Sequence, residues 1–364
     1  MKRTPLYQAH VDADARMVEF AGYEMPVQYP LGVKKEHLWT RDSAGLFDVS
    51  HMGQIVLRGD NVKTELEALL PVDVLGLELN HQRYGVFTTT NGGVSDDLMF
   101  TNLGDHEIYM VVNAACKEQD IAHLKNNLPT TEVEVVDRAL VALQGPKARE
   151  VVAQVLPELK DLLFMQSTKL EWNGIELWVS CSGYTGEDGY EISVPNEAAI
   201  EFCAALTAYD EVEWIGLGAR DSLRLEAGLC LYGHDMDQST TPVEASITWA
   251  IQKVRRAGGE REGHFVGADV ILSQFTKGVS RKRVGFIVDG KAPVREGVDI
   301  VTEAGDLAGS VTSGGFAPSL GKPIVMAYVQ TERLDQPLFA SLRGKLVPLT
   351  PAKMPFFPSR YYRG

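Results

Sequence analysis

The segment Tyr84-Gly-Val-Phe-Thr-Thr-Thr-Asn-Gly-Gly-Val-Ser-Asp-Asp-Leu-Met-Phe-Thr101 carries the clearest structural signal in the chain. Residues 84–90 are rich in β-branched and aromatic side chains, and residues 94–101 return as the partner strand. Between them, Asn91-Gly92 supplies the positive φ angles of a tight turn. We therefore predict an antiparallel hairpin, which favours an α+β fold over repeated βαβ units.

The sequence around this hairpin continues the mixed pattern. We predict a strand over 54–59 and a helix over 61–70 before it, then a strand over 107–113 and a helix over 117–125 after it. A second mixed segment runs to about residue 250. Its expected strands cover 140–143, 171–180 and 190–194, and its expected helices cover 196–208, capped by Asn196, and 219–229.

The C-terminal part of the chain has a different pattern. From residue 283 onward, short strands recur about every ten residues, with Gly and Pro between them. The expected strands cover 283–288, 306–312, 324–329 and 342–348. This spacing predicts a small all-β barrel or a jelly roll, with a boundary near residue 275.

Composition excludes several classes of partner. The 364 residues hold 35 Lys and Arg against 49 Asp and Glu, and the resulting formal charge of −14 repels nucleic acid. The longest apolar run covers only 324–329, whereas a helix needs roughly 20 apolar residues to cross a bilayer. We therefore expect neither a nucleic-acid partner nor a membrane partner.

The cysteines and the N-terminus indicate the compartment. Cys116, Cys181, Cys203 and Cys230 are widely spaced, and the N-terminus lacks the apolar core of a secretory signal. A reducing compartment is expected: the cytoplasm, or the mitochondrial matrix for a processed eukaryotic chain. No metal site is predicted, and the Walker loop, H-E-x-x-H and G-x-S-x-G motifs are missing.

The adjacent acids Asp96 and Asp97 are candidates for chemistry. Consecutive strand residues point to opposite faces, so one of the two carboxylates must face inward or into a cleft unless both sheet faces are wet. A semi-buried acid could bond to a ligand nitrogen or accept its proton. The alternative is that both acids only solubilise the strand after the turn.

Two more charged residues could contact a nitrogen-rich or anionic ligand. Glu191 faces away from Tyr190 and Ile192, so its carboxylate either accepts paired N–H bonds from an edge such as that of a pterin or is an exposed hairpin residue. Arg220 shares a helix face with Arg224 and lies in the first helical turn. Its partner is either a ligand anion or an internal acid.

Ten short strings are spread over nearly the whole chain. They are Arg3-Thr-Pro-Leu-Tyr7, Ala21-Gly-Tyr-Glu-Met-Pro26, Phe47-Asp-Val-Ser-His-Met-Gly53, Gly92-Gly-Val-Ser-Asp-Asp-Leu98, Leu143-Gln-Gly-Pro146, Gly183-Tyr-Thr-Gly-Glu-Asp-Gly189, Gly218-Ala-Arg-Asp221, Arg224-Leu-Glu-Ala-Gly228, Leu231-Tyr-Gly233 and Thr312-Ser-Gly314. Together and in this order they resemble the T-protein family of the glycine cleavage system, the tetrahydrofolate-dependent aminomethyltransferases.

The resemblance implies a multi-domain folate-binding fold. Three domains surround a folate channel; the first two are interleaved antiparallel α/β subdomains, and the last is an all-β barrel. We expect a folate-binding region over 1–275, in which 1–50 joins 140–275 as one subdomain and 51–139 forms the second. The barrel is expected over 276–364.

The resemblance also implies a reaction and a partner. The substrate is an aminomethyl group carried on the lipoyl arm of H-protein, and tetrahydrofolate accepts the one-carbon unit. The products are ammonia, 5,10-methylenetetrahydrofolate and dihydrolipoyl H-protein. The basic bridge over 253–261 either meets an acidic surface of H-protein or is a solvated loop.

The family's functional residues match positions of this chain. The resemblance assigns Asp97 as the catalytic aspartate beside N10 of the folate, where it can steer a proton and stabilise positive charge. Seven further positions match folate contacts: Glu191 and Asn113 for the pterin, Tyr84 and Tyr184 for rings, Arg220 and Tyr361 for the glutamate tail, and Tyr232 for the channel lining.

The chain departs from the family pattern at three positions. Tyr23 stands where tryptophan is usual, Ser95 replaces an aliphatic residue before the Asp pair, and His234 replaces an amide. Two other functions share this fold: a tetrahydrofolate-dependent demethylase of a sulfonium such as dimethylsulfoniopropionate, and a non-catalytic folate-binding protein. The retained Asp-Asp-Leu, Gly-Ala-Arg-Asp and Leu-Tyr-Gly strings favour the aminomethyltransferase.

Overall fold

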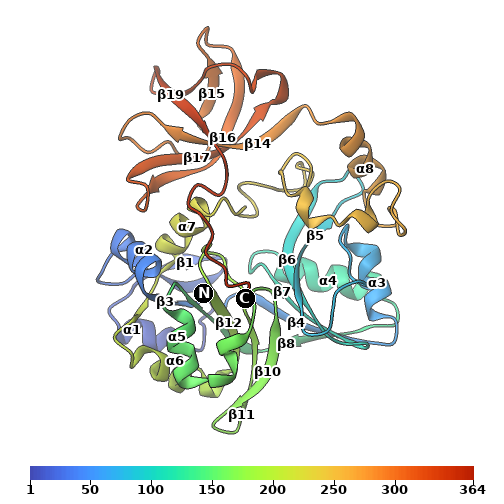
Figure 1. Ribbon diagram of the computed structural model, residues 1–364, viewed down its shortest axis with the longest axis vertical. Helices are drawn as coiled ribbons and strands as arrows, with labels where there is room; N and C mark the ends of the chain where they lie inside the picture. Colours follow the sequence, from blue (N-terminus) through green and yellow to red (C-terminus); the bar gives the residue numbers. More distant parts are fainter.

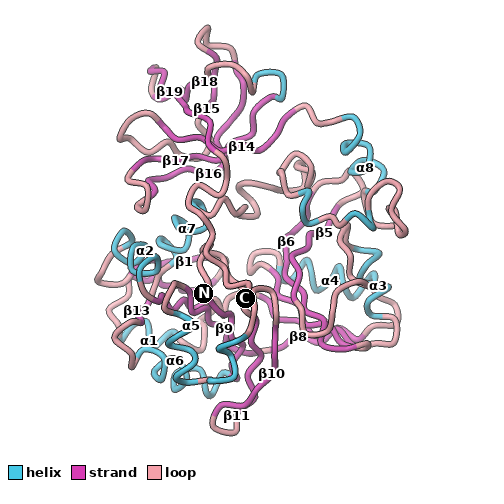
Figure 2. Tube along the Cα trace, in the orientation of Figure 1, coloured by secondary structure: helices cyan, strands magenta, loops and turns pink.

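Three main sheets organise the computed structural model, which describes residues 1–364. A six-stranded sheet and a five-stranded sheet occupy the lower half of Figure 1, and a closed barrel lies above them. The C-terminal tail returns from the barrel to the lower units, where Arg360 N–H donates to Gly186 O and Phe164 N–H donates to Tyr362 O, both at 2.8 Å. Figure 2 shows that long loops connect the sheets.

The six-stranded sheet combines the N-terminal and middle parts of the chain. Its strands run in the order β10 (Ser167–Trp172), β11 (Ile175–Ser180), β12 (Gly189–Pro195), β9 (Arg138–Gln144), β3 (Ala44–Asp48) and β13 (Val212–Trp214). The same parts of the chain form α1 (Tyr7–Asp12), α2 (Val33–Asp42), α5 (Ala148–Val155), α6 (Ala199–Thr207), α7 (Leu217–Glu226) and the ribbon of β1 (Arg16–Phe20) and β2 (Tyr23–Gln28). Because β3 pairs with both β9 and β13, the first 50 residues contribute a strand to this sheet.

The five-stranded sheet contains the hairpin that the sequence predicted. Its strands run in the order β5 (Gln82–Thr88), β6 (Val94–Gly104), β7 (Glu107–Val112), β4 (Gly53–Arg58) and β8 (Glu132–Val136), with α3 (Val62–Leu69) and α4 (Lys117–Asn127). Only Gly92 adopts a positive φ, at 79°, so the expectation for Asn91 was wrong. The loop between β5 and β6 has more than two residues, so it needs a left-handed residue only at Gly92.

The segment that follows α7 packs against the five-stranded sheet. Val94 N–H donates to Asp237 O and Thr240 O, and Arg255 forms an ion pair with Glu67 at 3.1 Å. This segment holds the short 3-10 turns η3 (Thr248–Ala250) and η4 (Lys253–Arg255), and then α8 (Ala268–Lys277). The predicted subdomain boundaries stay a prediction.

The closed barrel confirms the expected C-terminal architecture. Its six strands are β14 (Arg281–Val288), β17 (Lys322–Gln330), β16 (Leu307–Ala317), β15 (Asp299–Thr302), β18 (Leu338–Leu342) and β19 (Lys345–Ala352). Together with the two antiparallel-rich α/β sheets, it confirms the α+β class. No helix has the length and apolar character that crossing a membrane requires.

Three further local expectations were wrong. The stretch 171–180 is two strands rather than one, because Asn173-Gly174 adopts φ angles of 51° and 78° and turns the chain. Arg343-Gly344 divides 342–348 in the same way, with φ angles of 50° and 78°. Asn196 forms no side-chain cap; the chain instead makes a 3-10 turn over Asn196–Ala198 before α6.

A buried charge network joins three parts of the molecule. Glu226 at the end of α7 accepts from His37 Nε2 at 3.0 Å and from Arg41 NH2 at 3.0 Å, both on α2. Arg41 also bonds to Glu187 at 2.7 Å, and Glu187 accepts from Arg360 of the C-terminal tail. Glu226 and Glu187 are each at most 1% exposed. This network therefore fixes the tail and α2 against α7.

Candidate functional site

Asp96 and Asp97 face opposite sides of β6, as the alternation predicted. Asp96 is fully buried with Leu98 and Phe100, whereas Asp97 is partly exposed. In the hairpin register Asp97 lies opposite Val86 of β5. Ser95 makes no side-chain hydrogen bond to either carboxylate.

Asn113 connects the two acids from the end of β7. Its side-chain Nδ2 donates to Asp97 Oδ1 at 2.7 Å and lies 2.9 Å from Asp96 Oδ1. Its backbone N–H donates to Asp96 Oδ2 at 3.3 Å. The amide therefore holds the Asp97 carboxylate in one orientation.

The surroundings of Asp97 favour its protonated form. Burial and the neighbouring charge of Asp96 raise the pKa of Asp97 to about 7, although the Asn113 hydrogen bond opposes this shift. An acid with this pKa exchanges a proton readily near neutral pH. Tyr84 lies close to it: burial and the Asp97 charge raise the pKa of the Tyr84 phenol.

Aromatic side chains extend from Tyr84 toward the surface. Tyr84 and Tyr232 pack on the same apolar cluster, which includes Val86 and Cys230. The Trp249 ring lies 5.2 Å from the Tyr84 ring and is 60% exposed. Trp249 was missed in the sequence because nothing near it in the chain indicates that its turn packs beside β5.

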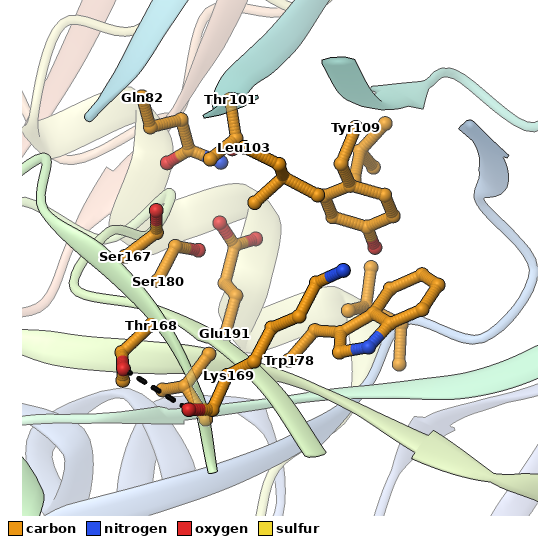
Figure 3. Close-up of a pocket in the computed structure, with 13 residues that line it drawn as sticks. Gln82, Thr101, Leu103, Tyr109, Ser167, Thr168, Lys169, Trp178, Ser180 and Glu191 are labelled. Atoms are coloured by element: carbon orange, nitrogen blue, oxygen red, sulfur yellow. Dashed lines mark hydrogen bonds between the residues drawn. The ribbon is translucent and has the colours of Figure 1, made fainter. Parts of the chain in front are cut away.

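Glu191 lines a small cavity between β12 and the other sheet. The cavity has a volume of about 20 Å³, room for roughly one water molecule. Figure 3 shows the Glu191 carboxylate pointing toward Gln82, Ser167 and Ser180. Ser182 Oγ donates to Glu191 Oε2 at 2.6 Å.

Two residues beside Glu191 also escaped the sequence reasoning. Gln82 Oε1 and Ser167 Oγ are buried, line the same cavity, and have no hydrogen-bond partner. Buried polar atoms are normally satisfied, so unpartnered ones at a cavity wall indicate a place for a ligand or a water. No sequence motif marks either residue.

The two arginines of α7 have different surroundings. Arg224 pairs internally with Asp221 at 2.8 Å and with Asp235 at 2.7 Å. Arg220 forms no ion pair; its guanidinium lies 4.8 Å from the ring centre of Tyr184. Of the two arginines, Arg220 is the one available to an anion.

The remaining predicted folate contacts are Tyr184 and Tyr361. Tyr184 is fixed by a hydrogen bond from its hydroxyl to the Cys230 carbonyl. Tyr361 stacks on Phe164 with ring centres 4.0 Å apart, and no contact joins it directly to Asp97 or Glu191. The structure thus brings Asp97, Asn113 and Tyr84 together, and Arg220 with Tyr184, while Tyr361 sits on the C-terminal tail.

Comparison with known families covers almost the entire chain. The GCVT N-terminal domain family matches residues 6–255, and the glycine cleavage T-protein C-terminal barrel domain family matches residues 281–358. The chain belongs to the glycine cleavage T-protein family. The resemblance inferred from the ten strings is thereby confirmed.

Individual T-protein relatives agree over their full length. A probable mitochondrial aminomethyltransferase of Schizosaccharomyces pombe is 44% identical, and the match covers 100% of this chain and 95% of the relative. The mitochondrial aminomethyltransferase of Pisum sativum is 43% identical, with 100% and 91% covered. The crystal structure of glycine cleavage system aminomethyltransferase T from Bartonella henselae superposes with a TM-score of 0.94 at 40% identity, covering 100% of this chain and 99% of that chain.

T-protein family membership fixes the activity class. The chain is an enzyme, an aminomethyltransferase of the glycine cleavage system, which confirms the prediction from the sequence. The demethylase and the non-catalytic binder are not favoured. The eukaryotic T-protein relatives are mitochondrial.

Proposed function

We propose that this chain transfers the one-carbon unit of aminomethyl-dihydrolipoyl H-protein to tetrahydrofolate. The folate nitrogens N5 and N10 form two new C–N bonds to the methylene carbon while its bonds to sulfur and to the amino nitrogen break. The two protons lost from N5 and N10 balance those gained by the thiol and by ammonia. The observation that carries this proposal is Asp97, held by Asn113 and with a pKa near 7.

Asp97 is proposed as the catalytic proton acceptor. As a carboxylate beside N10 it can take the proton that this nitrogen loses, and its charge stabilises the iminium character of the transferring carbon. The Asn113 amide keeps one oxygen of Asp97 engaged, which leaves the other for the substrate. Asn113 therefore serves the pterin site mainly by orienting Asp97.

Glu191 is proposed to bind the pterin edge. Its carboxylate can accept from the 2-amino and N3 hydrogens, and Gln82 Oε1 offers a further acceptor on the same cavity wall. We place the pterin edge at the mouth of this cavity, because its volume is too small for a ring. Tyr84, Tyr184 and Tyr232 would line the channel for the rest of the folate.

The folate tail and the partner complete the proposal. Arg220, unpaired beside Tyr184, and Tyr361 on the C-terminal tail are proposed contacts of the glutamate tail. H-protein is the proposed macromolecular partner. Within the basic bridge, Arg255 and Arg261 both pair with Glu67, which leaves Lys253 and Arg256 without an ion pair and able to meet an acidic surface. The proposed compartment is the cytoplasm, or the mitochondrial matrix for a processed eukaryotic chain.

Replacing Glu191 with glutamine should weaken tetrahydrofolate binding by about 10- to 100-fold, since hydrogen bonds to a charged group contribute about 1.5–3 kcal/mol. Anaerobic titration calorimetry measures this directly. Glu171→Gln, an exposed acid on β10 of the same sheet, is the matched control and should bind as the native protein does. Equal affinities for all three proteins would remove Glu191 from the pterin site.

Turnover should rise through an acidic limb centred near pH 7, because Asp97 must be ionised to accept a proton. The raised pKa also makes ionisation of Asp97 costly in the folded state. Asp97 should therefore lower the free energy of unfolding as the pH rises from about 4 to about 7. Asp97→Asn should therefore have the higher Tm at pH 8, by a margin that shrinks toward pH 5. Calorimetric scans test the difference in Tm, and a pH profile of kcat/KM tests the acidic limb. If the acidic limb persists in Asp97→Asn, it belongs to another group.

A further inference from the structure

Asp120 is a buried acid that the proposed mechanism does not use. It lies on α4 and is 1% exposed, and no N–H or hydroxyl donor reaches its Oδ2 atom. Asp96, fully buried on the inner face of β6, is its carboxyl neighbour. Burial raises the pKa of Asp120, and the hydrogen bond between the two carboxyls raises it further. A buried carboxylate that no donor reaches is costly, which indicates that Asp120 is a neutral acid.

No cation compensates this part of the protein. Asp96, Asp97 and Asp120 form no ion pair with any Lys, Arg or His, and Lys117, at the start of α4, bonds to the Tyr23 hydroxyl. The backbone and side-chain N–H groups of Asn113 donate to Asp96, and the side chains of Cys116 and Asp120 also lie within hydrogen-bond reach of it. Like charges this close cannot all persist, so one proton must be retained among them.

We propose that Asp120 is a positioning residue: it keeps its proton and donates a hydrogen bond through it to Asp96, so that Asp96 stays anionic and holds the Asn113 amide that orients Asp97. The order of contacts is Asp120 to Asp96, Asp96 to Asn113, and Asn113 to Asp97. The proton sits between the first two carboxyls, so the pair carries one negative charge. This inference rests on the proposed role of Asp97.

The negative charge on Asp96 also affects the proton affinity of Asp97, because it is one cause of the raised pKa of Asp97. Without the Asp120 donor, Asp96 would itself take up a proton, and Asp97 would become a weaker base. The groups that face the pair are Asp97 of the hairpin, Asn113 and Cys116 before α4, and Tyr232 after α7. Tyr84 contacts Asp97, and the His123 ring on α4 packs on Phe87, the strand neighbour of Asp96.

The pH profile tests this proposal with three variants. Asp120→Ala should move the acidic limb of kcat/KM down by about one pH unit, because the charge beside Asp97 is lost. Asp120→Asn, which has the same shape and a permanent N–H donor, should restore the limb to its native position. Glu118→Gln, an exposed acid of the same helix, is the control and should leave the limb in place. A purely structural Asp120 would lower stability in both Asp120 variants without moving the limb.

An infrared measurement tests the shared proton without any assay of activity. At pH 8, the difference spectrum of native protein minus Asp120→Asn should contain one band of a protonated, buried carboxyl that shifts in D2O. Absence of this band, or a limb in Asp120→Asn that moves as it does in Asp120→Ala, overturns the proposal. If the band is present but Asp97→Asn keeps full turnover, the role of Asp97 fails while the Asp120–Asp96 pair stands.

Discussion

Replacing Asp97 with asparagine is expected to lower turnover by about 100-fold or more while folate affinity stays within a few-fold of native. Loss of a positioned acid or base typically costs this much, because the proton no longer has an acceptor in the transition state. Asparagine has nearly the same shape and can still bond to Asn113, so the fold should persist. The measurement is single-turnover formation of 5,10-methylenetetrahydrofolate from loaded H-protein, beside equilibrium binding of tetrahydrofolate.

Asp105→Asn is the matched control for this substitution. Asp105 lies in the β6–β7 turn with a side chain 91% exposed, and it contacts only Lys63. It should keep native turnover. A variant of Asp97 that keeps turnover within about 10-fold of native would contradict the assignment of Asp97 as the proton acceptor.

Replacing Glu226 with alanine is expected to destabilise the protein by about 3–5 kcal/mol, the usual cost of removing one partner of a buried ion pair. The change leaves His37 and Arg41 buried beside an empty position, and it also removes the acceptor of the Ser319 N–H. Hydrogen bonds from His37 and Ser319 hold the pKa of Glu226 below its usual value although burial opposes this. The stabilisation is therefore present at neutral pH and is lost as pH falls through that lowered pKa.

Urea unfolding followed by circular dichroism at pH 7.5 measures this loss. Glu134→Ala is the control: its pair with Arg58 is exposed, with 48% and 42% of the two side chains accessible, and should be worth at most about 1 kcal/mol. Equal unfolding midpoints for the two variants would show that the network contributes no more than a surface pair does.

The sequence predicted the hairpin of β5 and β6 and the pattern of exposure within strands, but it missed some local turns. Alternation along β6 separated a buried Asp96 from an accessible Asp97, and alternation along β12 placed Glu191 away from the core that holds Tyr190. The turn at Asn173-Gly174 was missed although Asn-Gly is a strong hairpin signal. The turn at Arg343-Gly344, which carries only a glycine, was missed as well.

Contacts between distant segments could not be read from the sequence. Asp120 meets Asp96 because α4 packs beside β6, and Trp249 meets Tyr84 because the segment after α7 crosses to the other sheet. Arg220 and Arg224 lie on the same face of one helix, so the sequence does not distinguish them. Only tertiary packing brings Asp235 to Arg224. The chemical roles of the site residues came from family resemblance and await the experiments above.

The most direct test mixes the purified protein with aminomethyl-loaded, lipoylated H-protein and tetrahydrofolate, and follows ammonia and 5,10-methylenetetrahydrofolate together. We expect the two products to appear in equal amounts and to depend on tetrahydrofolate. Folate binding without either product, under conditions where the protein is folded and H-protein is loaded, would contradict the proposed aminomethyl transfer.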